Sequence, residues 1–197
     1  LAAPTLLRFT ERNPNVRVRI FEGLDEVSLQ MVRQGEIDFA IGTLTGRDGL
    51  HSRKMITAPE CLVSRAGGPS LPEGQGIKLV LPELRAQRRA AIASCLASEG
   101  IPVDSQLFLN SGLAILDLVG RSEWRTIAPC LVMDPVDDMD RFHMRPFATE
   151  QLNVSLYLLE STTRVLPPEA EDFVTILVEE AQRMKQQWLE IFAAQAG

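Results

Sequence analysis

The chain has 197 residues, of which 45% are hydrophobic and 23% charged, and its formal net charge at pH 7 is −6. This length and composition suit two small lobes with a sizeable core. The bases are dispersed, which argues against direct binding of nucleic acid, because neutralising phosphates needs clustered Lys and Arg. No stretch approaches the ~20 apolar residues of a membrane span, and Leu1–Thr10 lacks the basic start of a signal peptide.

The first forty or so residues predict a helix, a strand, a helix and a strand in turn. Pro4–Arg12 has the apolar spacing of a short amphipathic helix, and Val16–Phe21 alternates apolar and polar residues as a strand does. Asp25 is a suitable N-cap for the second helix, and Gly35 supplies the left-handed residue that ends it. The apolar run Ile37–Ile41 indicates a strand covered on both faces. Together the last three elements predict a parallel βαβ unit.

The same alternation continues through the rest of the chain. Further elements are predicted as extended segments at Arg53–Thr57 and Cys61–Ser64, a strand at 77–82, a helix at 83–99, a strand at Gln106–Asn110, a helix from Ser111, strands at Arg125–Ala128, 141–147 and 153–160, and a long helix from Pro167. The Gly- and Pro-rich stretch 67–76 is the predicted lobe boundary. The predicted fold class is α/β, with two lobes that each hold a mostly parallel sheet and flanking helices.

The motifs of the common enzyme classes are missing from the sequence. There is no nucleophile elbow, zinc-protease, P-loop or dinucleotide-binding motif, and His51 and His143 have no visible nucleophile or metal partner. Ser111 lies at a strand-to-helix turn but lacks the glycine that specifies a nucleophile elbow. The four Asp among residues 134–140 miss the ligand spacing of a calcium loop. We therefore expect no catalysis, no metal and no cofactor.

Two other groups of side chains could have a function. Arg85, Arg88 and Arg89 share one face of a predicted helix and could hold an anion, but an exposed basic face is the more common use of such a cluster. The cysteines are odd in number and widely spaced, which indicates reduced thiols that pack as small hydrophobic residues. These cysteines are Cys61, Cys95 and Cys130.

Small, polar or turn-forming residues follow four of the predicted strands. In open parallel sheets a ligand binds outside the carboxyl ends of the strands, and helix N-termini there offer free N–H groups to an anion. We therefore predict a small-molecule site at these strand ends, against the alternative that they are ordinary turns. The predicted site residues are Leu24, Asp25, Thr43, Thr45, Pro82, Glu83, Asn110, Ser111 and Gly112.

The chemistry of these residues favours one class of ligand. Hydroxyls and N–H groups without a bulky base suit a small carboxylate better than a cation. Asp25 and Glu83 would repel an anion unless it also carries hydrogen-bond donors. The sequence therefore predicts a small polar organic acid that bears hydroxyl or amino groups.

Five segments resemble, in the same order, the effector-binding domain of LysR-type transcriptional regulators. They are "LAAPTLLRFTERNPNVRVRIFEG", "LQMVRQGEIDFAIGT", "ECLVSRAGGPSL", "LDLVGRSEWRTIAPCLV" and "VLPPEAEDFVTILVEE". The most recognisable part is a helix that ends in Gly-x-Ile-Asp and leads into an apolar strand. The resemblance covers nearly the whole chain, and its strength lies in the order of the five segments.

The resemblance implies a periplasmic-binding-protein type II-like fold, in which two crossover segments join the lobes. Lobe I would hold residues 1–60 and 148–197, and lobe II residues 61–147. A small metabolite would bind between the lobes and control an attached winged helix-turn-helix. The family's ligand positions would fall on the predicted site residues other than Thr45. The family's opening strand would precede Leu1, so we expect the chain to continue upstream.

The resemblance also implies partners and surroundings. We expect a cytoplasmic homodimer, and a tetramer in the full-length protein, that contacts DNA only through the missing N-terminal domain and has no membrane contact. In such a dimer, Pro4–Arg12 and Val16–Phe21 would pack against Leu84–Glu99 and Gln106–Leu109 of the other chain. An alternative from another class is a solute-binding protein of a transporter with the same two-lobed fold. An enzyme of related fold is a third possibility, for which the sequence offers no acid, nucleophile or metal set.

Overall fold

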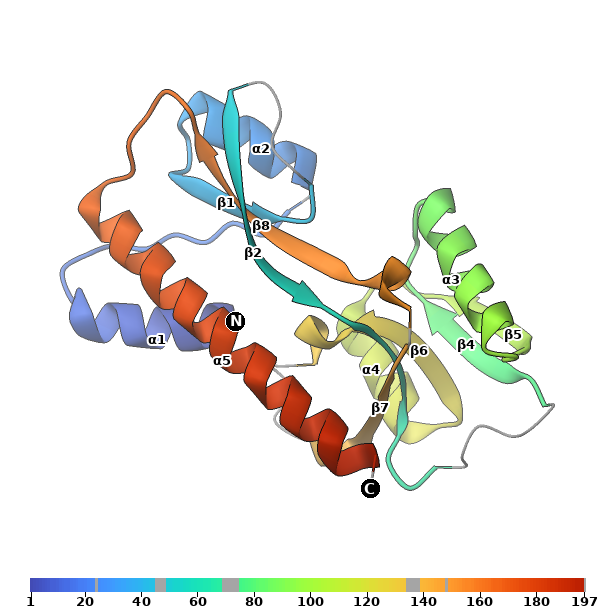
Figure 1. The fold of residues 1–197 in the computed structure, drawn as a ribbon. Helices are drawn as coiled ribbons and strands as arrows, with labels where there is room; N and C mark the ends of the chain where they lie inside the picture. Colours follow the sequence, from blue (N-terminus) through green and yellow to red (C-terminus); the bar gives the residue numbers. More distant parts are fainter. Residues whose placement is uncertain (24, 45–48, 69–74, 134–138, 148, 197) are drawn as a thin grey trace. The chain divides into compact units, whose positions relative to one another are not determined.

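The computed structural model of the chain describes residues 1–197 except 24, 45–48, 69–74, 134–138, 148 and 197. The chain divides into two compact units (Figure 1). Unit 1 comprises Leu1–Thr57 and Val154–Gln187, and unit 2 comprises Ala58–Asn153 and Trp188–Gly197. Among the described helices, none combines the length and the apolar character that a membrane-crossing segment needs.

Unit 1 contains a three-stranded sheet with helices on both faces. Its elements are α1 (Ala2–Arg12), α2 (Asp25–Gln34), β1 (Phe39–Gly42), β2 (Leu50–Ala58), β8 (Val154–Ser161) and α5 (Pro168–Ala196), and the strand order is β1–β8–β2. The last residue of β2 and the end of α5 from Trp188 belong to unit 2. Alternate residues of β1 face opposite sides, because Ala40 packs with α2 whereas Phe39 and Ile41 pack with α1 and α5. The predicted α-helices from Pro4, Asp25 and Pro167 are therefore present, each within a few residues of its expected bounds.

The described pairing in this sheet is antiparallel, which corrects the prediction of a mostly parallel sheet. β1 pairs with β8 in a register that runs from Phe39↔Glu160 to Gly42↔Tyr157. The apolar run of β1 is covered on both faces, as its composition indicated. Its neighbour in the sheet, however, comes from the far end of the chain, and no local pattern reports the direction of so distant a strand.

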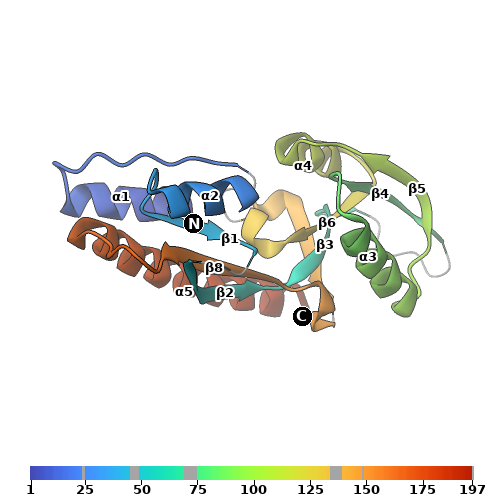
Figure 2. The same ribbon diagram turned by 90° about the horizontal axis from the view of Figure 1, so that it is seen from above.

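The segment Val16–Phe21 is not a strand, so the predicted parallel βαβ unit is not formed by the described residues. The segment runs as an open connection from α1 to α2 (Figure 2). Ile20 and Phe21 leave 54% and 53% of their surface exposed. An alternating pattern makes a strand possible, but a strand also needs a neighbour that exchanges main-chain hydrogen bonds with it.

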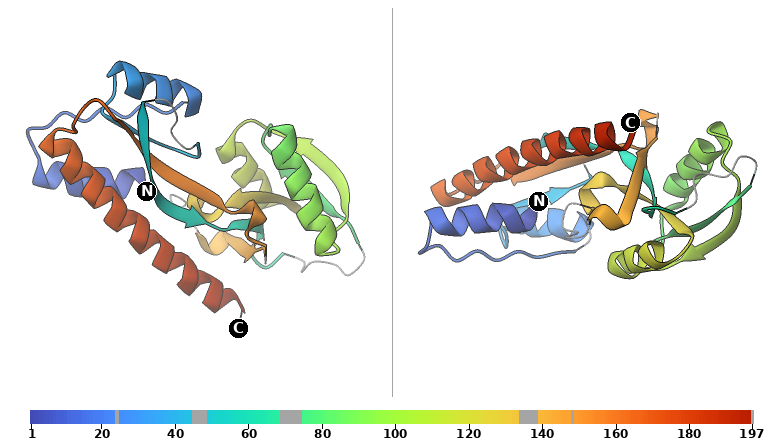
Figure 3. Two further views of the ribbon diagram at one scale, coloured as in Figure 1. Left: turned by 45° about the horizontal axis from the view of Figure 1, so that its top comes forward. Right: turned by 90° about the horizontal axis from the view of Figure 1, so that it is seen from below.

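Helices α1 and α5 lie side by side, as Figures 2 and 3 both show. The rings of Phe9 and Phe173 lie 5.1 Å apart between centroids at their contact. At the edge of this contact Arg8 binds Glu180 at 2.7 Å. Burial raises the pKa of the Glu180 carboxyl, but the hydrogen bonds and charges of Arg8 and Arg183 outweigh burial, and the pKa lies below its ordinary value. The ionised carboxylate is thus the form that joins the two helices.

Helix α2 ends in one step because Gly35 adopts a left-handed conformation, with φ of +79°. The N–H of Glu36 donates to Met31 O at 3.0 Å, and the N–H of Gly35 donates to Val32 O at 3.2 Å, which is the Schellman pattern. Arg164 also donates to Val32 O, at 2.8 Å, from the connection between β8 and α5. A side chain from the far end of the chain therefore closes this helix.

Unit 2 contains a five-stranded mixed sheet in the order β5–β4–β6–β3–β7. Its elements are β3 (Glu60–Arg65), β4 (Ile77–Leu81), α3 (Ala86–Ser98), β5 (Val103–Phe108), α4 (Gly112–Arg121), β6 (Trp124–Pro129) and β7 (Phe142–Pro146), with short 3-10 helices η1 (Cys130–Val132), η2 (Met139–Arg141) and η3 (Glu150–Leu152). β4 is parallel to β5 and β6, whereas β3 is antiparallel to β6 and β7. The prediction of a mostly parallel sheet is therefore only half right here.

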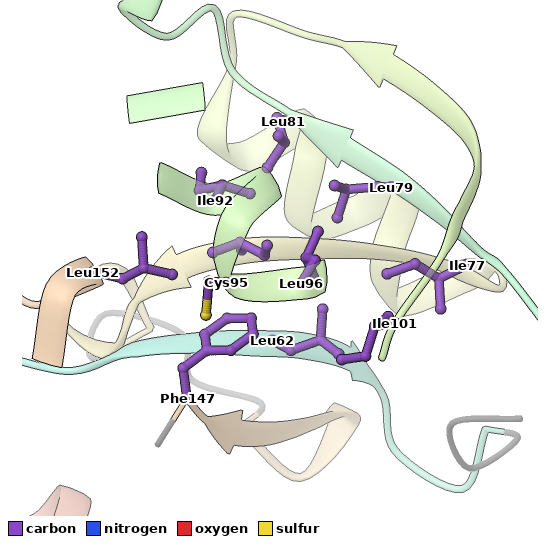
Figure 4. Close-up of a cluster of buried hydrophobic side chains, with 11 residues drawn as sticks. Leu62, Ile77, Leu79, Leu81, Ile92, Cys95, Leu96, Ile101, Phe147 and Leu152 are labelled. Atoms are coloured by element: carbon purple, nitrogen blue, oxygen red, sulfur yellow. The ribbon is translucent and has the colours of Figure 1, made fainter. Parts of the chain in front are cut away.

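Helix α3 covers one face of this sheet, and its inward residues Ile92, Cys95 and Leu96 meet the strands' apolar side chains (Figure 4). Arg88 on the same helix is half-buried, pairs with Glu60 and donates to Leu152 O at 3.0 Å. Burial lowers the pKa of the Arg88 guanidinium. Arg88 therefore joins α3 to β3 and η3, which corrects the prediction that it belongs to an exposed basic face.

All three cysteines are free thiols inside unit 2. Cys61 and Cys130 are fully buried, and Cys95 is 5% exposed. The hydrogen bond with Cys61, and then burial, raise the pKa of the Cys130 thiol. The prediction of thiols that pack as small hydrophobic residues is confirmed.

We predict that Gly35→Ala destabilises the protein more than Gly100→Ala. Both glycines have positive φ, at 79° and 66°, so each substitution should cost about 1 kcal/mol in backbone strain. A Cβ at Gly35 would also lie 2.5 Å from Arg164 Nη1, whereas nothing lies within 4 Å of one at Gly100. Displacing Arg164 should add about 1 kcal/mol for its lost hydrogen bonds. Urea unfolding of both variants measures the difference, and equal losses would contradict the role given to Arg164.

Candidate functional site

The strand-end group of unit 1 consists of Asp25, Thr43 and Leu44, where α2 begins and β1 has ended. Asp25 Oδ2 accepts three hydrogen bonds, from Thr43 N at 3.0 Å, Thr43 Oγ1 at 2.6 Å and Leu44 N at 3.2 Å. A carboxylate that accepts several N–H and O–H groups is held firmly in one orientation. The Thr43 donors that were predicted to meet a ligand are therefore used by Asp25.

The role of Asp25 differs from its prediction as a helix N-cap. Asp25 is the first residue of α2, and the hydrogen bonds described for its carboxylate go to the end of β1. The same carboxylate lies close to Gly42, the last residue of β1, because a Cβ placed on Gly42 would lie 3.0 Å from Asp25 Oδ1. The carboxylate of Asp25 therefore packs against the end of β1.

The strand-end group of unit 2 consists of Pro82, Glu83, Asn110, Ser111 and Gly112. β4 and β5 are adjacent and parallel, with Leu81 opposite Phe108, so the residues that follow them come together. Leu109 N donates to Leu81 O at 3.0 Å, and Glu83 N donates to Asn110 Oδ1 at 3.0 Å. Parallel pairing, which the sequence predicted for this pair of strands, therefore brings these predicted site residues together.

Ser111 caps helix α4. Its Oγ accepts from Ala114 N at 3.3 Å, and its backbone is extended, with φ of −135°. Ile115 N donates to Ser111 O at 2.9 Å. In the described part of the chain, the N–H groups of Gly112 and Leu113 meet no acceptor, as is usual in the first turn of a helix. A Cβ placed on Gly112 would meet nothing within 4 Å, so the space on that side of Gly112 is open.

The predicted site residues thus form two groups, each within its own unit. Asp25 with Thr43 belongs to unit 1, and Pro82, Glu83, Asn110, Ser111 and Gly112 belong to unit 2. The first group offers acceptors, because the Thr43 hydroxyl donates to Asp25, whereas the second offers donors at the start of α4. Leu24, Thr45 and the Asp residues of 134–138 lie outside the described residues.

Sequence reasoning missed the partners of these residues rather than the residues themselves. The Leu44 N–H was not expected to take part, and Asn110 was not expected to bind the backbone at Glu83. An acid at the start of one helix and Gly-Thr at the end of the next strand is the signal that could have suggested the first contact. Asn110 carries no comparable local signal, because Glu83 lies 27 residues before it in the sequence.

We predict that Asp25→Ala destabilises unit 1 by about 0.5–1.5 kcal/mol, because two exposed donors of Thr43 and the part-buried N–H of Leu44 lose their acceptor. Asp38→Ala is the matched control, since Asp38 is an exposed acid of unit 1 and should change stability by less than about 0.5 kcal/mol. Thermal and urea unfolding give both values. If the two variants unfold alike, the Asp25 contacts do not hold the end of β1.

Nearly all of the chain matches one known protein family. Residues 1–182 match the sequence profile of the LysR substrate binding domain. The HTH-type transcriptional regulator TdcA of Escherichia coli (strain K12) is 26% identical over 136 residues, which are 65% of this chain and 44% of TdcA. The chain therefore spans about half the length of that relative.

Two solved structures show the same fold. The BenM effector binding domain with its effector benzoate has a TM-score of 0.66 and 13% identity, with 96% of this chain and 87% of that chain covered. The effector binding domain of QuiR in complex with shikimate has a TM-score of 0.61 and 13% identity, with 92% and 90% covered. At this level of identity the likeness concerns the fold alone.

Proposed function

The chain belongs to the LysR substrate binding domain family, and we propose that a small polar organic acid with hydroxyl or amino groups is its effector. The domain is the effector-binding part of a LysR-type transcriptional regulator, a class of proteins that are not enzymes. The family match favours the regulator domain over the two alternatives, a solute-binding protein of a transporter and an enzyme of related fold. We further propose that the effector controls DNA binding by an attached winged helix-turn-helix.

The observation that carries the proposed ligand is the start of α4. The N–H groups of Gly112 and Leu113 meet no acceptor in the described part of the chain, and the space at Gly112 is open. The positive end of the helix dipole favours a carboxylate there. Ser111 Oγ accepts from Ala114 N, which leaves its hydroxyl hydrogen available to the same carboxylate. Benzoate in BenM and shikimate in QuiR are carboxylates too.

The strand-end group of unit 1 offers hydrogen-bond acceptors. The Thr43 hydroxyl gives its hydrogen to Asp25, so its oxygen can meet a ligand only as an acceptor. Glu83 in unit 2 is an exposed acid that also accepts hydrogen bonds. A ligand that meets these groups needs hydroxyl or amino donors besides its carboxylate. We therefore propose that these acceptors select an acid that carries such donors.

We also propose a homodimer. In unit 1 the exposed apolar side chains include Leu7, Ile20 and Phe21, at 66%, 54% and 53% exposure. In unit 2 they include Leu107 and Phe108 on the edge strand β5, at 39% and 42% exposure. Surfaces of this kind favour association, and the proposed contact joins α1 and Val16–Phe21 of one chain to α3 and β5 of the other. A tetramer in the full-length regulator belongs to the same proposal.

The ligand proposal is tested by calorimetry with a panel of small hydroxy and amino acids. Ser111→Ala and Thr43→Val should each weaken the acid that binds by about 0.5–1.5 kcal/mol, the cost of one hydrogen bond. Thr10→Val removes an exposed hydroxyl from α1 and should leave the affinity unchanged. If both site variants bind as the unchanged chain does, the strand ends are ordinary turns and the ligand lies elsewhere.

The dimer proposal is tested by light scattering at high micromolar concentration. The unchanged chain should have the mass of a dimer, and Phe21→Asp or Leu107→Asp should shift it towards the monomer, because a charge would be buried at the contact. Val165→Asp is the control, since Val165 is 90% exposed and lies outside the proposed contact. A monomer at every concentration would overturn the proposal.

A further inference from the structure

Unit 1 holds a cavity of about 520 Å³ that the proposed effector site does not use. Its walls include His51 and Arg53 from β2, Glu160 from β8, Arg164 from the β8–α5 connection, and Glu171 and Val174 from α5. These elements meet where α5 starts beside the sheet (Figure 1). The volume is within the range of small-molecule pockets.

The cavity is separate from the strand-end group of unit 1. Glu160 pairs with Phe39, at the beginning of β1, whereas Thr43 follows the end of that strand. Glu160 also shares the sheet face of Phe39 and Ile41, which pack against α5, while α2 covers the opposite face. A ligand in the cavity would therefore leave Asp25 and Thr43 untouched.

The charges in the cavity are balanced but not paired with one another. Two Arg face two Glu, so the formal charge of the lining is zero with His51 neutral. In the described part of the chain, no ion pair involves Arg53, Glu160 or Glu171. Opposite charges that line one space without touching leave a gap that a ligand with both charges can fill.

Other side chains that line the cavity are already engaged in contacts within the protein. Arg164 donates to the carbonyls of Val32 and Ile37 at the end of α2. Val174 is 5% exposed and gives the cavity an apolar patch. The groups available to a ligand therefore include the Arg53 guanidinium, two carboxylates and an apolar patch.

We propose that this cavity binds a small zwitterion of the amino-acid type. Its carboxylate would bind Arg53, its ammonium group would bind Glu160 or Glu171, and an apolar side chain would lie on Val174. A simple anion would leave both carboxylates facing a further negative charge, and a simple cation would do the same to the guanidiniums. A zwitterion leaves the charge balance of the cavity unchanged.

The test is a titration of the ¹⁵N-labelled chain, followed by NMR, with three ligands of one shape. L-leucine carries both charges, N-acetyl-L-leucine only the negative one and L-leucinamide only the positive one. L-leucine at millimolar concentration should shift the amide signals of Arg53, Glu160 and Val174, and the two derivatives should bind about tenfold more weakly, as expected for one lost charge-assisted contact. Absence of these shifts, shifts at Gly112 instead, or equal binding of the three ligands would overturn the proposal.

Variants of two facing residues complete the test. Arg53→Gln and Glu160→Gln should each weaken L-leucine by about tenfold or more, because each removes one partner of the zwitterion. Lys54→Gln is the matched control, since Lys54 is the next residue of β2 and points to the other face of the sheet. Similar loss of binding in all three variants, or none in any, would overturn the assignment.

Discussion

The structure of unit 1 depends on the hydrogen bonds that hold the two ends of helix α2. At the N-terminus of α2 the Asp25 carboxylate accepts hydrogen bonds from Thr43 and Leu44, and at its C-terminus Arg164 donates to the carbonyls of Val32 and Ile37. Both sets of hydrogen bonds join a charged side chain to main-chain groups, which cost free energy when they are left unpaired. Residues from opposite ends of the sequence thereby fix one helix on the sheet.

These hydrogen bonds also determine which donors and acceptors remain free at the strand ends. Asp25 uses the hydrogen of the Thr43 hydroxyl, so unit 1 presents oxygen acceptors. At α4 the Ser111 side chain satisfies Ala114 and leaves the preceding N–H groups available, so unit 2 presents donors. The two units therefore differ in polarity although both follow the rule that ligands bind at the ends of strands.

Features set by neighbouring residues could be predicted from the sequence. Gly35 ends α2 and Ser111 begins α4, because a left-handed glycine and a serine cap act within a single turn. The direction of β8 beside β1, and the pairing of Arg88 with Glu60, join residues far apart in sequence and leave no local trace. The hydrogen bond from Thr43 to Asp25 likewise joins two separate elements, and it was not predicted.

The placement of the cysteines makes the opening of one unit measurable by the alkylation of its thiols. Cys61, Cys95 and Cys130 all belong to unit 2, and the most exposed of them shows 5% of its surface. An alkylating reagent can reach such thiols only when the surrounding structure opens, so the rate of alkylation reports the free energy of opening. Because Leu1–Thr57 and Val154–Gln187 contain no cysteine, the fluctuations of unit 1 are silent in this chemistry, and those of unit 2 can be followed without labels or substitutions.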